Sequence, residues 1–155
     1  MSTTPVATHQ YCTFVADGLL FGVVVTDVQE VLRAQPMTPA PRAPAEIRGL
    51  LNLRGQIVTA IDLRDRLGLP SRPPEDAPMN VVIHSRGEIV TLLVDEIGDV
   101  IDTAGARIEQ VPSTLPAPLR DTLVGVVPLA DQLLLVLDAH RAADVVGSRN
   151  PGGTS

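Results

Sequence analysis

The chain has 155 residues, which suffices for one ordinary domain or for two small lobes packed on each other. With 45% hydrophobic and 19% charged residues it is expected to fold around a substantial core, which excludes a disordered chain. The net charge of −6 and the aromatic content of 2% argue against a nucleic-acid partner, because phosphate neutralisation needs an excess of Lys and Arg and base stacking needs aromatic side chains.

Short apolar runs follow one another along the chain, interrupted by Gly, Pro and Asp. The clearest runs are residues 19–25, 57–61, 81–83, 89–94 and 133–137. Aliphatic runs of this length between turn residues predict the strands of an all-β barrel or sandwich. Short helices are expected at residues 44–47, 63–67, 116–119 and from about 138 to 146.

Particular residues mark where some of these elements begin or end. Asp62 and Asp138 each precede an expected helix and are predicted N-caps, and Gly68 can end the helix at 63–67. The Pro-dense stretches 36–44 and 70–78 predict connecting segments, because proline has no backbone N–H for a helix or a sheet.

Both ends of the chain are polar, and residues 1–9 and 148–155 are predicted to be flexible tails. The N-terminus has neither a basic region nor a long apolar stretch, and no run approaches the length of a membrane span. We therefore expect a cytoplasmic protein without direct membrane insertion.

Two blocks of the sequence occur twice. Residues 18–32 match residues 87–101 in the order of apolar and acidic positions, and residues 49–62 match residues 125–138. The pattern indicates one strand-rich unit used twice, with the Pro-dense stretch 70–78 between the copies. Because each copy is too small to bury its own apolar area, we expect two lobes that share a core.

A charged residue and a glycine, Arg54-Gly55, lie between two apolar runs at an expected hairpin tip. The second copy has Ala130-Asp131 there, so the fold itself does not require an arginine. A pair between Arg54 and Glu30 would suit the planar fork of the guanidinium. As an exposed pair it would add only about 0–1 kcal/mol to the stability of the fold, so its role would be to hold the hairpin in one orientation. The alternative is a solvated arginine without a partner.

Candidate groups for catalysis or metal binding are scattered. The three histidines lack the spacing of a ligand set, and Cys12 is the only cysteine, which excludes an internal disulfide. Asp27, Glu30, Asp95 and Asp99 fall at corresponding strand ends and are interpreted as solvated rim charges. We expect no metal, no cofactor and no enzymatic activity, with a small hydrolase based on clustered carboxylates as the remaining catalytic alternative.

Five segments together carry a recognisable pattern. They are Phe21-Gly22, Val28-Gln29-Glu30-Val31, residues 44–55, residues 57–64 and Val94-Asp95-Glu96-Ile97. The most specific part runs from Gly49 through Asn52, Arg54 and Gly55 to Asp62-Leu63-Arg64. These residues resemble the CheW family of bacterial chemotaxis coupling proteins, and the resemblance extends from about residue 11 to residue 146.

The resemblance implies a single CheW-like domain over residues 10–147. Its fold would be all-β, with two five-stranded SH3-like β-barrels packed on a shared core, a few short helices and a C-terminal helix at about 139–146. We expect the first barrel mainly in residues 10–72 and the second mainly in residues 78–138.

The same resemblance implies a non-enzymatic adaptor. Its partners would be the regulatory domain of the histidine kinase CheA and the cytoplasmic hairpin of methyl-accepting chemoreceptors, in arrays beneath the membrane. The chain would be cytoplasmic and recruited to these arrays through its partners. Kinase contact is expected on barrel faces other than the receptor-binding groove.

The resemblance also places a receptor-binding groove between the barrels. The residues it assigns to partner binding are Val25, Val28, Glu30, Met37, Arg54, Gly55 and Ile97. The groove would accept the apolar face of a receptor helix, with Arg54 paired to Glu30 at its edge. Two alternatives stay open: a β-barrel sensor that binds a small ligand in this groove, and a CheW-like adaptor of a non-flagellar pathway such as one controlling pili.

Overall fold

The computed structural model describes residues 10–73, 75–104 and 106–148, and within these ranges the chain forms two five-stranded sheets. The first sheet contains β1 (Gln10–Ala16), β2 (Leu19–Val24), β8 (Glu96–Asp102), β9 (Leu123–Pro128) and β10 (Leu133–Leu137). The second contains β3 (Val28–Leu32), β4 (Ile47–Leu53), β5 (Gln56–Asp62), β6 (Met79–Ser85) and β7 (Glu88–Val94). The predicted all-β class with two five-stranded barrels and few helices is confirmed.

The two copies of the duplicated unit, β1–β5 and β6–β10, exchange strands. The spatial orders are β8-β1-β2-β10-β9 and β3-β6-β7-β5-β4, so each sheet joins the first two strands of one copy to the last three of the other. Each sheet therefore takes three strands from one of the two stretches expected for the barrels, residues 10–72 and 78–138, and two strands from the other. A 3-10 turn, η1 (Val25–Asp27), redirects β3 to pair with β6, and β8 correspondingly pairs with β1.

Three of the hairpins in the described ranges turn through only two residues. The turns are Asp17-Gly18, Arg54-Gly55 and Arg86-Gly87, and both residues of each have positive φ. This is the backbone of a type I′ turn, whose twist matches that of the flanking strands. Glycine takes the second position at no steric cost, whereas the side chain at the first position disfavours that conformation.

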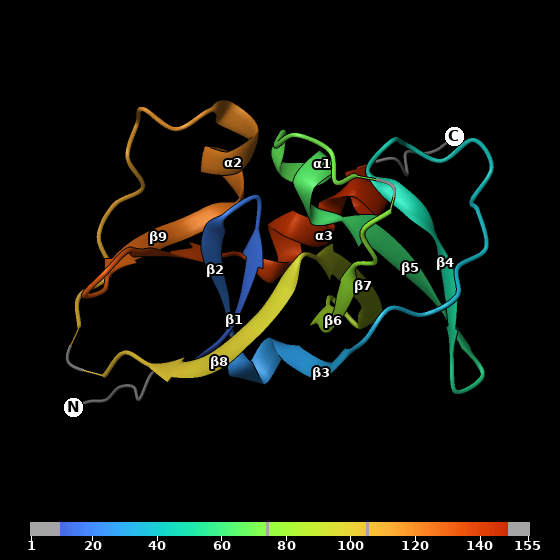
Figure 1. Ribbon diagram of the computed structural model, residues 1–155, viewed down its shortest axis with the longest axis horizontal. Coiled ribbons are helices and arrows are strands. Elements are labelled where there is room, and N and C mark those ends of the chain that lie inside the picture. The colour runs from blue at the N-terminus through green and yellow to red at the C-terminus, as the bar shows by residue number, and fades with distance from the viewer. Residues whose placement is uncertain (1–9, 74, 105, 149–155) are drawn as a thin grey trace.

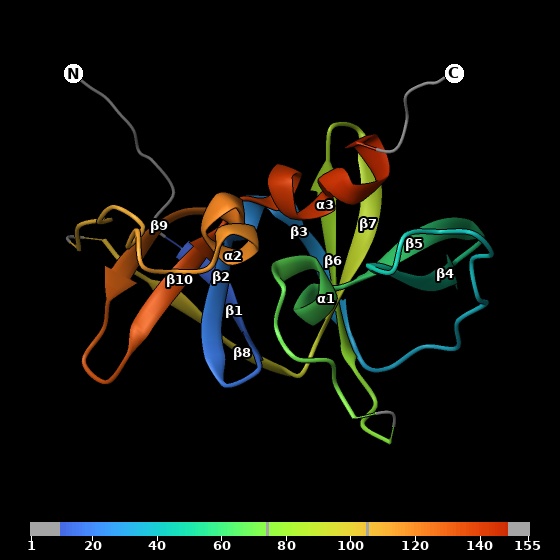
Figure 2. The same cartoon turned by 90° about the horizontal axis from the view of Figure 1, so that it is seen from above.

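A shared apolar core lies between the two sheets. Phe14 and Phe21 of the first sheet are completely buried, with ring centroids 6.2 Å apart, and belong to one cluster with Ile83 and Leu92 of the second sheet. The helices are α1 (Leu63–Leu67), α2 (Ala117–Thr122) and α3 (Ala139–Ser148). Figures 1 and 2 show α1 and α3 between the two lobes and α2 against the first. The predicted shared core is thus confirmed.

The helix limits follow the sequence signals at most places. The side chain of Asp62 accepts hydrogen bonds from the first turn of α1, and Gly68 ends that helix at φ 75°. Asp138 accepts from the N–H of Arg141 at 3.0 Å and so caps α3. The helix expected at residues 44–47 is wrong: the segment makes one turn, closed by a bond from the Ile47 N–H to the Pro44 carbonyl, before β4 begins.

The predicted C-terminal helix at about 139–146 is present and continues to Ser148. Of the tails predicted at residues 1–9 and 148–155, Ser148 instead ends α3, and the other residues lie outside the described residues. No helix in the described ranges is long and apolar enough to cross a membrane.

Candidate functional site

The predicted partnership of Arg54 and Glu30 is present in the structure. Arg54 lies at the tip of the β4–β5 hairpin, and its Nη2 donates to Glu30 Oε2 on β3. Because β3 and β4 are opposite edges of the second sheet, this contact joins the two edges across the barrel. The Arg54 side chain is 66% exposed and that of Glu30 only 22%, so the carboxylate is the sheltered partner and the guanidinium faces solvent.

An apolar cluster lies inside the barrel next to this pair. It contains Leu53, which directly precedes Arg54, and Leu32, which follows Glu30 by two positions and so lies on the same face of β3. On the outer side, Ile57 is 62% exposed two residues after the turn. The pair therefore lies where the apolar interior of the barrel reaches the surface.

The backbone of the turn is also held by a side chain. Asn52 Oδ1 accepts a hydrogen bond from the Gly55 N–H at 2.8 Å. Arg54 and Gly55 have φ angles of 50° and 90°, so the turn matches the predicted hairpin tip. The sequence analysis gave the Asn52 side chain no role, although its place in the Asn52-x-Arg54-Gly55 run was a visible signal.

Three further predicted site residues lie where the two lobes meet. Val28 begins β3 and Ile97 lies in β8, and both are half-buried against the shared core. Val25 is half-buried in η1, which contacts both β1 and β6. The strands β3 and β8 are edge strands of different sheets, so the region around these residues contains parts of both lobes.

Met37 lies elsewhere. It packs on Leu51 and Leu93, beside the middle of β4, and lines a cavity of about 170 Å³ together with Arg48 and Arg72. The contact between its neighbour Thr38 and Leu50 fixes this position. The structure therefore separates Met37 from the hairpin tip at the end of β4.

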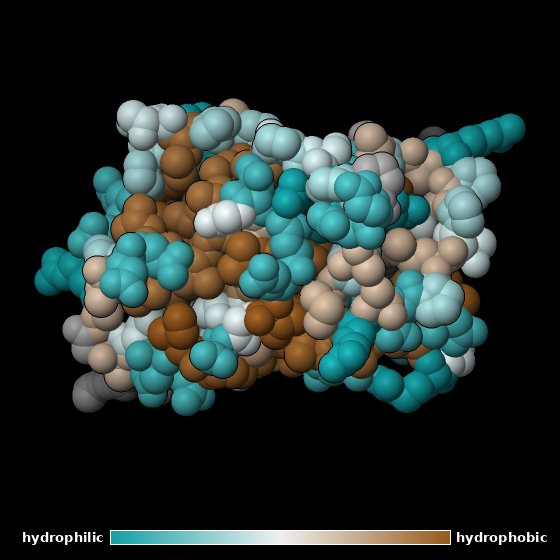
Figure 3. All heavy atoms as spheres, in the orientation of Figure 1, coloured by the Kyte–Doolittle hydropathy of each residue, from teal (hydrophilic) through white to brown (hydrophobic). Residues whose placement is uncertain are grey.

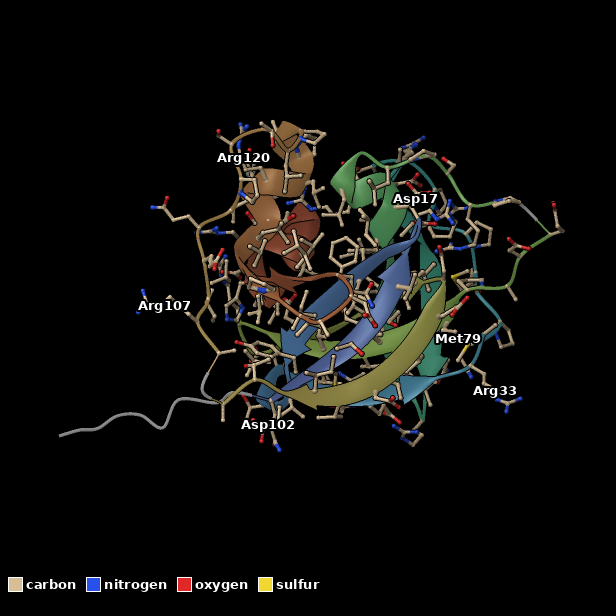
Figure 4. The ribbon with its side chains drawn as sticks, turned by 60° about the vertical axis from the view of Figure 1, so that its left-hand side comes forward. Asp17, Arg33, Met79, Asp102, Arg107 and Arg120 are labelled. Carbon is tan, nitrogen blue, oxygen red and sulfur yellow. The ribbon has the colours of Figure 1, made fainter. Side chains whose placement is uncertain are left out.

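A network of ion pairs was missed by the sequence analysis. Asp95, interpreted above as a solvated rim charge, is only 18% exposed, so that interpretation is wrong for this residue. It accepts from Arg64 Nη2 at 2.6 Å, from Arg72 Nη2 at 3.1 Å and from the Asp17 N–H at 2.8 Å. Figure 4 shows Asp17 at the β1–β2 turn beside α1, so the network links both lobes.

Asp62 is the second carboxylate of this network. Its side chain is 1% exposed and, besides capping α1, accepts from Arg48 Nη2 at 2.8 Å and from Arg72 Nη1 at 3.1 Å. Arg72 therefore bridges Asp62, the last residue of β5, and Asp95, which follows the neighbouring parallel strand β7. The only sequence signal for Arg72 was its place in the Pro-dense stretch 70–78, which predicted a connector.

The network lowers the pKa of Asp95. Burial acts to raise the pKa of Asp95, but the bonds from Arg64, the Asp17 N–H and Arg72 outweigh it and hold the pKa below the ordinary value of 3.8. Asp95 is therefore ionised at neutral pH and forms ion pairs with Arg64 and Arg72. In the described residues, no group of three His, Cys, Asp or Glu side chains is arranged to hold a metal ion.

Comparison with known proteins identifies the class to which this fold and site belong. The family model for the CheW-like domain matches residues 10–146. The chain is 31% identical over 137 residues to the chemotaxis protein CheW of Bacillus subtilis (strain 168), covering 88% of each chain. It is 28% identical over 118 residues to the chemotaxis protein CheW of Rhizobium meliloti (strain 1021), covering 76% of each.

A solved structure gives the same result. The crystal structure of the scaffolding protein TtCheW from Thermoanaerobacter tengcongensis matches with a TM-score of 0.75 and 25% identity, covering 88% of this chain and 92% of that one. The chain therefore belongs to the CheW-like family, and the relatives it matches are chemotaxis proteins and a scaffolding protein. The predicted resemblance is confirmed.

Proposed function

We propose that the chain couples the cytoplasmic hairpin of methyl-accepting chemoreceptors to the regulatory domain of the histidine kinase CheA. Family membership supports an adaptor role, and one observation of this chain carries the receptor side: Glu30 holds the guanidinium of Arg54 at an exposed hairpin tip. The chain would work in the cytoplasm, recruited to receptor arrays through these partners.

The receptor contact combines a polar and an apolar part. Arg54 has five N–H donors, and the exposed portion of its guanidinium is available to carbonyl or carboxylate oxygens of a partner helix. Val28 and Ile97, half-buried on the edge strands β3 and β8, would meet the apolar face of that helix. Glu30 limits the rotation of Arg54, which reduces the entropy lost when a partner binds.

An adaptor needs a second contact surface apart from the first. The first lobe has an apolar hollow of about 290 Å³ with leucines on its walls, visible as the brown area over β2 and β10 in Figure 3. Leu133 on its rim is 44% exposed, and Leu19 and Leu115 pack from beneath against the shared core. This hollow lies in the lobe opposite to Arg54, which supports simultaneous binding of two partners.

The proposal is tested by measuring binding to a chemoreceptor hairpin fragment and to the kinase regulatory domain. Arg54→Ala and Glu30→Ala are expected to weaken receptor binding about tenfold or more, which corresponds to about 1.4 kcal/mol. Both variants should keep the circular dichroism spectrum and the kinase binding of the parent.

Arg86→Ala is the matched control. Arg86 occupies the same position of a type I′ turn in the β6–β7 hairpin and is 70% exposed, but its ion-pair partner is Asp144 on α3. This variant should bind the receptor fragment as the parent does. Equal receptor affinity of the parent and Arg54→Ala would refute the proposal.

The alternatives differ in support. An adaptor of a pathway controlling pili would use the same two surfaces, and gene neighbours or purified partners of each pathway distinguish the two. A small-ligand sensor is disfavoured because Phe14, Phe21, Ile83 and Leu92 fill the space between the sheets and are completely buried. It would require a thermal shift with a metabolite in the absence of protein partners.

A further inference from the structure

The hairpin that carries Arg54 differs from the other two-residue turns by one contact. In all three described turns of this kind, both residues have positive φ. Among the described residues, a side chain accepts from the N–H of the turn glycine in the β4–β5 turn alone, and that side chain is Asn52. The residues at the same position, three before the glycine, are Val15 in the β1–β2 hairpin and His84 in the β6–β7 hairpin.

This contact matters because Arg54 occupies a backbone conformation that L-residues avoid. Its φ of 50° lies in the left-handed region, where Cβ comes close to the following carbonyl. The corresponding tip of the β9–β10 hairpin, Ala130-Asp131, turns through more residues and has no positive φ in the described residues. The first copy of the duplicated unit therefore has an arginine in a strained conformation at this tip, and the described residues of the second copy's tip have no positive φ.

The contact between Arg54 and Glu30 depends on the conformation of the β4–β5 turn, because no sheet pairing joins the two strands that carry these residues. Glu30 belongs to β3 and Arg54 follows β4, and these two strands are not neighbours in the sheet. A small change in the turn would move the guanidinium away from Glu30, since no ladder of backbone hydrogen bonds holds the two edges together at this point. Pairing of Leu53 with Gln56 closes the turn, and the bond from the Gly55 N–H to Asn52 is the side-chain contact that further restrains it.

We propose that Asn52 is a positioning residue for the partner-binding site. It holds the Arg54-Gly55 turn in the conformation in which the guanidinium meets Glu30 and faces the partner. This inference rests on the proposed receptor contact of Arg54 and adds the residue that determines its geometry.

The test is a double-mutant cycle on the full chain with a chemoreceptor hairpin fragment as the probe. Asn52→Ala is expected to weaken binding about three- to tenfold in the parent and less than about twofold in the Arg54→Ala background, because it acts through Arg54. Asn52→Asp keeps an acceptor for the Gly55 N–H and should bind within about twofold of the parent.

His84→Ala is the matched control, since it alters the same position of the β6–β7 hairpin and should leave affinity unchanged. An equal loss from Asn52→Ala in both backgrounds would show that Asn52 touches the partner directly, and would overturn the inference.

A second readout needs no partner. In the free protein, Asn52→Ala should speed amide exchange at Gly55 and shift the guanidinium resonances of Arg54 toward those of a solvated arginine. Unchanged resonances would overturn the inference. If Arg54→Ala itself leaves receptor affinity unchanged, the proposed receptor contact fails, whereas the resonances still report whether Asn52 positions Arg54.

Discussion

Asp95 shows how single residues hold the two lobes together. Its carboxylate binds Arg64 of α1 and Arg72 of the connector, both in the second lobe, and the N–H of Asp17 in the first. Its own N–H donates to the carbonyl of Val15 at 2.9 Å. The chain crosses from β7 to β8 at this residue, so the crossing point and the ion-pair network coincide.

Asp95→Asn is expected to destabilise the fold by about 2 kcal/mol, because Arg64 and Arg72, whose side chains are largely buried, lose a charged partner. Urea unfolding monitored by circular dichroism measures the change. Asp144→Asn is the control: its pair with Arg86 spans 3.7 Å between exposed side chains, so the change should stay below about 0.5 kcal/mol. Equal effects of the two variants would contradict this account of the network.

The lowered pKa of Asp95 predicts how this contribution depends on pH. A carboxyl whose pKa is depressed by folding stabilises the protein fully above its unfolded value of 3.8 and loses that effect as pH falls toward the folded pKa. The difference in unfolding free energy between the parent and Asp95→Asn should therefore be constant from about pH 7 to pH 5 and shrink below about pH 4. A difference that grows on acidification would contradict the assignment.

Residues differ in how far the sequence reveals their partners. The Arg54–Glu30 pair could be predicted because Arg54 stands at a hairpin tip marked by Gly55, and because a known family pattern includes both residues. The contacts of Asp95 could not, since Arg72 lies in a segment without periodicity. A long-range pair of this kind depends on how the connector folds back, which local patterns do not encode.

At the scale of elements, the edge of β4 depends on close backbone contact. Gly49 allows Thr38 to bridge to Leu50: a Cβ at Gly49 would lie 2.7 Å from the Thr38 carbonyl oxygen. Gly49→Ala should therefore destabilise the fold by about 1–3 kcal/mol, measured by thermal unfolding. Gln56→Ala on the exposed face of β5 serves as control, with a change within about 0.5 kcal/mol. A neutral Gly49→Ala would show that the segment moves aside freely.

Most strands were predictable as elements because aliphatic runs between turn residues have few other stable arrangements. The segment at residues 44–47 was mispredicted as a helix because it offers a helix-like start after Pro44. Pairing of β4 with β5 and Thr38 engages the backbone from Ile47 onward, and these tertiary contacts outweigh the local preference.

At the scale of the molecule, the exchange of strands makes each half of the sequence incomplete. The copies have the same strand pattern, so the sequence could reveal the duplication but not which copy supplies β3 or β8 to which sheet. We expect the separate fragments 1–73 and 74–155 to be unfolded alone and to form β-structure when mixed, as followed by circular dichroism. A fragment that folds alone with a cooperative transition would contradict the exchanged topology.

The arrangement of the whole molecule accords with an adaptor. The Arg54 hairpin lies at the end of one lobe and the leucine-walled hollow on the other, while the shared core and the Asp95 network fix the lobes relative to each other. A rigid body with two separate contact surfaces holds two partners at a defined spacing without any catalytic step.

The most direct test of the receptor contact is to map it by NMR on the isotope-labelled full chain as a chemoreceptor hairpin fragment is added. The account predicts the largest shifts at Arg54, Glu30, Val28 and Ile97, with saturation at a one-to-one ratio. Shifts confined to other faces of the molecule, with the Arg54 and Glu30 resonances unmoved, would contradict it.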